Sequence, residues 1–205
     1  MEGQKKLESE MTFTEVHRRK QIIDTAIAII SREGYQKTTI ANIAKEAGFT
    51  KGVVFYYFNN KDELAVQISQ VLLEELRSHT REHIKNITPL SDKLKAYIQA
   101  YLEFIKENRD KFSILMELGM NLNLNTKDPL FSSQTFFECR ESLAQLLSRD
   151  GKLGKISEID TASLTAVLQG MLDGLGLQYI SDSHAVDLTA CQKIILSMVD
   201  SFFQS

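Results

Sequence analysis

Residues 39–58 constrain the fold most, because they hold two apolar patterns that are too short to form stable helices alone. The first pattern recurs at helical spacing and ends at Gly48. After a three-residue turn, the segment KGVVFYYF places Val54 and Phe58 four residues apart, on one side of a second short helix. Isolated helices shorter than about 12 residues are marginal in water. A further helix must therefore cover both.

Residues 18–33 supply that covering helix. Their apolar side chains recur at helical spacing until Gly34, which is a favourable helix C-terminus. Thr38 or Thr39 can cap the first short helix and Thr50 the second, and Gly48 allows the turn between them a left-handed backbone. A long helix that packs across two short ones joined by a tight turn is a three-helix helix-turn-helix unit.

The remainder of the chain is predicted to be helical as well. Two prolines and ten glycines in 205 residues leave long stretches without breakers, and no segment alternates regularly between apolar and polar residues. The fold class is therefore all-α with about nine helices. Beyond the first three we expect helices at 61–87, 91–108, 109–118, 130–148, 158–180 and 185–203, with a loop at 119–129.

Charge divides the chain into parts of different character. Residues 1–61 hold ten Lys and Arg against seven Asp and Glu, a net +3, whereas the remainder holds fourteen against twenty, a net −6. A basic head on an acidic body keeps attraction to phosphate local. We expect a flexible arm at 1–15, the helix-turn-helix unit at 16–60 and a larger helical domain at 61–205.

No targeting or membrane signal is expected. The first twenty residues lack the apolar stretch of a signal peptide, and no apolar run approaches the roughly 18 residues of a membrane span. The two cysteines, Cys139 and Cys191, form neither a metal motif nor a disulfide framework. A reducing cytoplasm and the absence of a cofactor are therefore the predictions.

Residues 18–64 closely resemble the DNA-binding head of the tetracycline-repressor (TetR) family of bacterial regulators. The matching residues include Gly34, Thr39, Ile43, Ala44, Gly48, Gly52, Tyr57, Phe58, Lys61 and Leu64. The resemblance implies a homodimer that places two recognition helices in successive major grooves of a palindromic operator. It also implies a small-molecule effector, held in the body, that releases the protein from DNA, so that the regulator would usually repress.

The candidate DNA contacts lie on the second short helix and at the starts of its neighbours. Lys51 can reach a base edge or a phosphate, although it can equally be a solvated lysine, and Gly52 allows close approach of the backbone or merely tolerates packing. The family commonly has tyrosine at Phe55, so one phosphate hydrogen bond is expected to be replaced by an apolar contact. The full set is Thr39, Thr50, Lys51, Gly52, Val53, Phe55, Tyr56, Tyr57 and Lys61.

Two further sets belong to the helical body. Aromatic and methionine content suggests an apolar effector pocket with a polar hook, lined by Tyr97, Tyr101, Phe104, Met116, Met120, Phe136, Phe137, Gln169 and Asp173. The alternatives are that the aromatic and methionine residues are plain core and that Gln169 and Asp173 belong to the dimer interface. The last two helices have apolar faces too wide for one subunit. Their predicted dimer interface comprises Leu164, Leu168, Gly170, Met171, Gly174, Leu175, Ile195, Met198, Val199 and Phe202.

Two other functions compete with this interpretation. His79, Glu82 and His83 match the HxxEH pattern of inverted-motif zinc peptidases. The neighbouring residues in the sequence, however, are typical of a solvent-exposed helix face. The favoured prediction is therefore neither metal site nor enzyme, with catalytic or incidental metal binding as the alternatives. A helical interaction module that no longer reads DNA is the other rival.

Overall fold

The computed structural model describes residues 12–125, 140–147 and 160–203, and these form helices joined by turns, without a strand among them. They group into two compact units, Met1–Ser69 and Gln70–Ser205. The all-α fold with a helix-turn-helix at its N-terminal end is confirmed.

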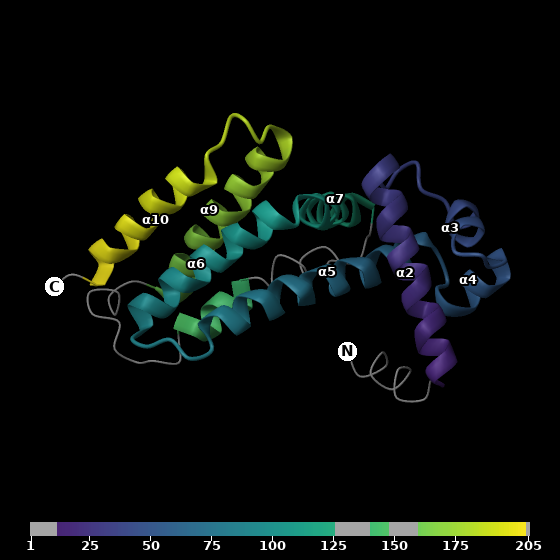
Figure 1. The fold of residues 1–205 in the computed structure, drawn as a ribbon, viewed down its shortest axis with the longest axis horizontal. Coiled ribbons are helices and arrows are strands. Elements are labelled where there is room, and N and C mark those ends of the chain that lie inside the picture. The colour runs from purple at the N-terminus through teal and green to yellow at the C-terminus, as the bar shows by residue number, and fades with distance from the viewer. Residues whose placement is uncertain (1–11, 126–139, 148–159, 204–205) are drawn as a thin grey trace. The chain divides into compact units, whose positions relative to one another are not determined.

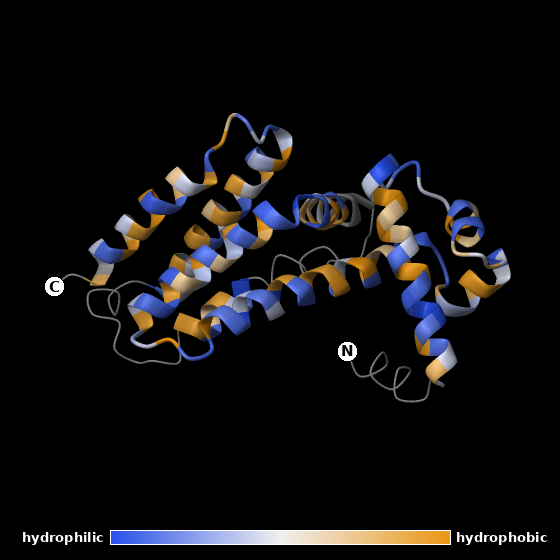
Figure 2. Ribbon diagram, in the orientation of Figure 1, coloured by the Kyte–Doolittle hydropathy of each residue, from blue (hydrophilic) through white to orange (hydrophobic). Residues whose placement is uncertain are grey.

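The first unit is built around α2 (Phe13–Glu33), which packs on α3 (Ile40–Glu46) and is followed by α4 (Lys51–Tyr57) and the start of α5 (Lys61–Ile84) (Figure 1). The buried side chains of α2 are all apolar, and Figure 2 shows hydrophobic residues interspersed with hydrophilic ones along this helix. Each short helix contributes small or branched apolar side chains to this core. Its buried residues include Ile22, Ala26, Ile29, Ile43, Ala44, Val54 and Phe58.

The second unit centres on α6 (Leu90–Glu107). Helices α9 (Thr161–Ser181) and α10 (Leu188–Phe203) both pack on α6, and α7 (Arg109–Asn125) packs on α6 and α9 (Figure 1). A further helix covers residues 140–147. One close approach depends on a missing side chain, because a Cβ at Gly176 of α9 would lie 2.4 Å from the ring of Phe112. No helix in the described ranges is both long and apolar enough to cross a membrane.

Two helix boundaries differ from the prediction for identifiable reasons. Helix α2 begins at Phe13 rather than Arg18, because Thr12 and Glu15 form a capping box at its start. Residues 13–15 are therefore helical rather than part of a flexible arm. Helix α7 continues to Asn125, so the loop predicted at 119–129 is helical in its first half. Residues 1–11 and 126–129 lie outside the described residues.

Candidate functional site

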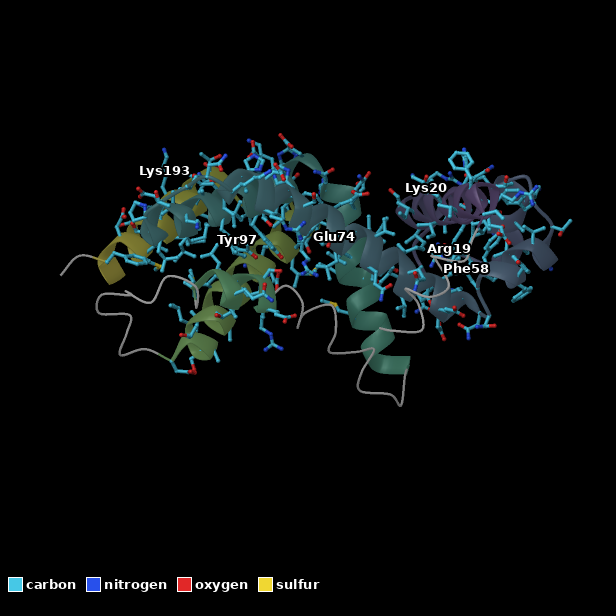
Figure 3. All side chains as sticks on the ribbon, turned by 90° about the horizontal axis from the view of Figure 1, so that it is seen from below. Arg19, Lys20, Phe58, Glu74, Tyr97 and Lys193 are labelled. Atoms are coloured by element: carbon cyan, nitrogen blue, oxygen red, sulfur yellow. The ribbon has the colours of Figure 1, made fainter. Side chains whose placement is uncertain are left out.

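The short helix α4 is held by one face and exposes the other. Val54 and the residue that follows the helix, Phe58, are 0% and 1% exposed. The guanidinium of Arg19 on α2 lies 5.4 Å from the centre of the Phe58 ring, and the two lie side by side in Figure 3. By contrast Phe55 is 49% and Tyr56 71% exposed. The buried pair therefore fixes which aromatic side chains α4 presents to the outside.

The N-termini of α3 and α4 are capped by the two predicted threonines. The Thr39 hydroxyl accepts a hydrogen bond from the amide of Asn42 at 3.2 Å, and that of Thr50 accepts one from the amide of Val53 at 3.4 Å. Gly48 adopts a φ of 73° in the turn between the helices. Helix starts carry partial positive charge and amides without helical partners. Both are suited to receive an anion.

Packing among the described residues does not require glycine at position 52. A Cβ at this position would meet only the Thr50 hydroxyl, at an ordinary 3.7 Å, and the residue is exposed. Glycine in a helix is less stable than alanine by roughly 0.5 to 1 kcal/mol. The helix therefore gives up stability at a position where the bare backbone is open to the outside, beside the exposed Lys51.

Tyr56 is not simply a free aromatic group. Its hydroxyl donates a hydrogen bond of 2.9 Å to Glu15, a residue that the sequence analysis did not single out. Glu15 also accepts from the backbone and side chain of Thr12, and these bonds, with that from Tyr56, lower its pKa. The capping-box pattern TFTE was the available signal for Glu15. The contact ties the exposed face of α4 to the start of α2.

Lys61 was predicted to contact a DNA phosphate, but its side chain is only partly exposed and binds groups of the first unit. Its ammonium donates to the carbonyl oxygens of Tyr35 and Thr38, at 2.8 and 2.9 Å, and lies 4.1 Å from the centre of the Tyr35 ring. The Tyr35 hydroxyl in turn donates to Asp62 at 2.7 Å. Lys61 thus fastens the start of α5 to the loop between α2 and α3. Val53 and Tyr57 are partly exposed, and Thr39 is exposed.

Comparison with known proteins agrees with this geometry. Residues 22–68 match the family described as bacterial regulatory proteins, tetR family. The chain is 28% identical to the nicotine-responsive transcriptional repressor HdnoR of Paenarthrobacter nicotinovorans over 93% of this chain and 98% of that protein. The fatty acid metabolism regulator protein of Bacillus subtilis is 23% identical, over 88% and 93% of the two chains.

The chain belongs to the TetR family of transcriptional regulators. The solved structure of the regulator FadR from Bacillus subtilis in complex with stearoyl-CoA has the same fold, with a TM-score of 0.70 at 19% identity over 90% of this chain and 98% of that one. These relatives regulate transcription, and none of them is described as an enzyme.

In this TetR-family chain the second unit contains a basic pocket of about 350 Å³ between α5, α6 and the helix at 140–147. Three cationic side chains follow one another at four-residue spacing along and just beyond the end of α5, and a fourth comes from the start of α6. The spacing was a sequence signal for this set, but the prediction did not use it. The lining residues are Arg77, Thr80, Arg81, Ile84, Lys85, Lys93, Tyr97, Ser142, Gln145 and Leu146.

The predicted effector-pocket residues are dispersed in the structure. Tyr97 lines the basic pocket, whereas Tyr101, Phe104 and Met116 are buried in the core and Met120 is 46% exposed. Phe136 and Phe137 lie outside the described residues.

Tyr101, Gln169 and Asp173 form a polar network between α6 and α9. The Tyr101 hydroxyl donates to Asp173 at 2.6 Å, and the Gln169 amide nitrogen donates to both partners at 2.9 Å. The Gln169 amide oxygen is buried without a hydrogen-bond partner. Burial raises the pKa of Asp173, while the bonds from Tyr101 and Gln169 and the charge of Arg140 act in the opposite direction. The core therefore contains an aspartate that is more easily protonated than usual.

The predicted dimer residues separate into two groups. Leu164, Leu168, Ile195 and Val199 are buried within the unit. The others that can be placed line an exposed apolar groove of about 330 Å³ between α9 and α10; they are Gly170, Met171, Gly174, Leu175 and Met198. Ile194 and Ile195 also line this groove, as do Gln178 and Cys191, which were not predicted. The side chain of Phe202 lies outside the described residues.

Replacing Asp173 by asparagine should stabilise the protein at neutral pH. Because the folded-state pKa of Asp173 is raised above its ordinary value of 3.8, wild-type stability falls as the pH rises from about that value through the folded-state pKa. Asparagine carries no charge, its oxygen can still accept from Tyr101 and Gln169, and its amide can donate to the unpartnered Gln169 oxygen.

Urea denaturation at pH 4, 6 and 8 measures this effect. The stability difference between Asp173→Asn and wild type should be smallest at pH 4 and grow in favour of the variant towards pH 8. Asp110→Asn, at an exposed aspartate in the first turn of α7, serves as the control and should show no such gain. A difference for Asp173→Asn that favours wild type at pH 8 would contradict the interpretation.

Proposed function

We propose that this TetR-family regulator is a homodimeric repressor that binds a palindromic operator and is released by a small-molecule effector. The single observation that carries the DNA-binding part is the division of α4, which buries Val54 and Phe58 and exposes Lys51, Gly52, Phe55 and Tyr56. Exposed aromatic and cationic side chains beside an open helix start provide contacts for base edges and for phosphates.

We assign operator binding to residues 16–60 and effector binding and dimerisation to residues 61–205. Contacts by Thr39, Thr50, Val53 and Tyr57 belong to this proposal, because their side chains lie on or beside the exposed surface of α3 and α4. The lysine contact is expected chiefly from Lys51. Because bacterial DNA lies in the cytoplasm, a repressor would act there.

A second copy of the chain is the proposed occupant of the groove between α9 and α10. Ile194 and Met198, at 58% and 49% exposed, line the groove. A Cβ at Gly170 or Gly174 would meet no described residue within 4 Å, so packing among the described residues gives no reason for glycine at either position. Glycines one helical turn apart allow the backbone of a partner helix to approach closely. Together these features support a bundle made of α9 and α10 from two subunits.

Gly174→Leu should weaken dimerisation without destabilising the subunit. Leucine is the better helix former by roughly 0.8 to 1 kcal/mol and has open space in the subunit, so helix content should be kept. In the dimer its side chain would occupy the place of the partner helix, and the dimer dissociation constant should rise at least tenfold, about 1.4 kcal/mol.

Sedimentation equilibrium together with circular dichroism gives both measurements. Lys193→Leu adds the same side chain at an exposed position of α10 that does not line the groove, and it should leave the dimer unchanged. Unaltered association of Gly174→Leu would place the interface elsewhere.

The basic pocket supports an effector with an anionic group and an apolar part. Arg77, Arg81, Lys85 and Lys93 bring four positive charges to the pocket, and Ile84, Tyr97 and Leu146 add apolar surface. The relatives respond to chemically different ligands, since one is named for nicotine and another was solved with stearoyl-CoA. The phosphates of an acyl-CoA complement these cations, whereas the amine of nicotine does not. An acyl-CoA-like anion is therefore the favoured effector class.

Stearoyl-CoA should release the protein from its operator, and nicotine should not. Lys93→Gln removes one of the cations and should raise the stearoyl-CoA concentration needed for half-release by roughly tenfold, because one charge-assisted contact contributes about 1.5 to 3 kcal/mol before screening. Lys106→Gln changes a lysine of the same helix that does not line the pocket, and it should behave as wild type. Release by nicotine alone would exclude the anionic class.

Selection of bound sites from random DNA tests the function as a whole. The expected product is a palindrome with half-sites about one helical turn apart, bound less tightly as salt rises. On that sequence Lys51→Ala should weaken binding by roughly 1 to 3 kcal/mol. Gly52→Ala should weaken it as well while raising the stability of the first unit, because the added methyl group fits the chain but obstructs DNA.

The control for these variants is Lys20→Ala. Lys20 is an exposed lysine of α2 whose ion pair with Asp24, at 2.6 Å, is solvent-exposed and contributes little. Its loss should change operator affinity much less than that of Lys51. Failure to recover any sequence at low salt would instead favour a helical interaction module.

A further inference from the structure

We propose that His79, His83 and Glu103 form a binding site for a divalent transition-metal ion in the second unit. The two histidines lie one turn apart on α5 and the glutamate lies on α6. Each residue offers one ligand atom, and these three atoms all lie within 4.8 Å of one another. Two imidazoles and a carboxylate are a donor set that Zn²⁺ and its neighbours in the transition series accept. The site goes beyond the proposed function and does not depend on it.

The tautomer of His83 suits a metal ligand. Its Nδ1 lies 2.7 Å from the backbone oxygen of His79, an acceptor, so Nδ1 carries the proton and donates it. The lone pair then resides on Nε2, which lies 3.7 Å from a carboxylate oxygen of Glu103. Metal-binding histidines are usually oriented in this way by a hydrogen bond from the other ring nitrogen.

The environment of the His79 ring also favours a role as a metal ligand. Its Nε2 is buried and has no hydrogen-bond partner among the residues that the structure describes. The ring packs against the edge of Phe104, with centroids 5.6 Å apart, and lies 4.3 Å from the ring of His83. Burying a polar atom without a partner is unfavourable, because the atom loses its hydrogen bonds to water. Coordination of a metal ion at this nitrogen would remove that cost.

The third ligand is not the glutamate of the HxxEH pattern. Glu82 lies 3.8 Å from the ammonium of Lys85, and it is absent from the cluster that contains Glu103. The arrangement therefore differs from the one that the peptidase motif would require, in which the carboxylate between the histidines has the catalytic role. A metal ion bound by His79, His83 and Glu103 would instead link α5 to α6.

The electrostatic and steric surroundings permit the site. Arg77 and Arg81 are two residues from His79, which places them about 200° around the helix, on the side that lines the basic pocket. Ligand atoms around a tetrahedral Zn²⁺ lie about 3.4 Å apart. His83 and Glu103 are 45% and 50% exposed at their side chains, so both can rotate the remaining distance. Their exposure also leaves room for water as a further ligand.

Titration of the untagged full-length protein with ZnCl₂ by calorimetry tests the proposal, with Co²⁺ absorption as a second probe of ligand geometry. We expect one ion per chain and a higher melting temperature with zinc. His83→Ala and Glu103→Gln should each weaken binding at least roughly tenfold and abolish the thermal shift. Both side chains are exposed, so neither variant should compromise folding. His79 is left unchanged because it packs on Phe104.

Glu82→Gln is the matched control and should bind zinc as wild type does. Three outcomes would overturn the proposal. One is the absence of stoichiometric binding to the wild-type protein. Another is equal loss in Glu82→Gln and Glu103→Gln, which would place the ion at the sequence motif. The third is full affinity in Glu103→Gln, which would leave only the histidine pair. Operator binding is not measured in any of these experiments, so the outcome is independent of the proposed function.

Discussion

The burial of Val54 and Phe58 is the interaction on which the DNA-reading unit depends. Helix α4 has seven residues and α3 has seven, and helices of this length are not stable in water without tertiary contacts. Both therefore form only where the rest of the unit covers their apolar sides. The same contact determines function, because an α-helix with two fixed residues has no remaining rotational freedom. Once Val54 points inward, Tyr56 must point outward, at 71% exposure.

The sequence could predict the elements wherever local signals and packing agreed. The bounds of α3 and α4 follow from threonine caps and a glycine turn, and they were predicted to within about one residue. Helix α7 shows the limit of such reasoning. Gly119 and the asparagines after it favour a turn locally, but Leu118 and Gly119 are buried and α7 packs on α9. Tertiary contacts therefore extended a helix that propensity alone would end.

The site was predictable to the extent that it lies on a single helix. Helical phase alone separates the buried and exposed residues of α4, whereas contacts between helices leave no one-dimensional signal. The carbonyl oxygens that hold Lys61, the hydroxyl that reaches Glu15 and the placement of Glu103 beside His79 all join residues far apart in sequence. Composition alone also could not distinguish pocket residues from core residues, and Tyr101 and Phe104 are core.

The glycines show how a residue that is required by packing within one chain can be distinguished from one that packing does not explain. At Gly176 a Cβ would collide with Phe112, so packing within the subunit accounts for the missing side chain. At Gly52, Gly170 and Gly174 the described residues leave space for a Cβ, and helix propensity favours one. A destabilising residue without an internal reason is consistent with a constraint from a partner. Under the proposed function, that partner would be DNA at the start of α4 in the first unit and a second subunit at the groove between α9 and α10 in the second unit.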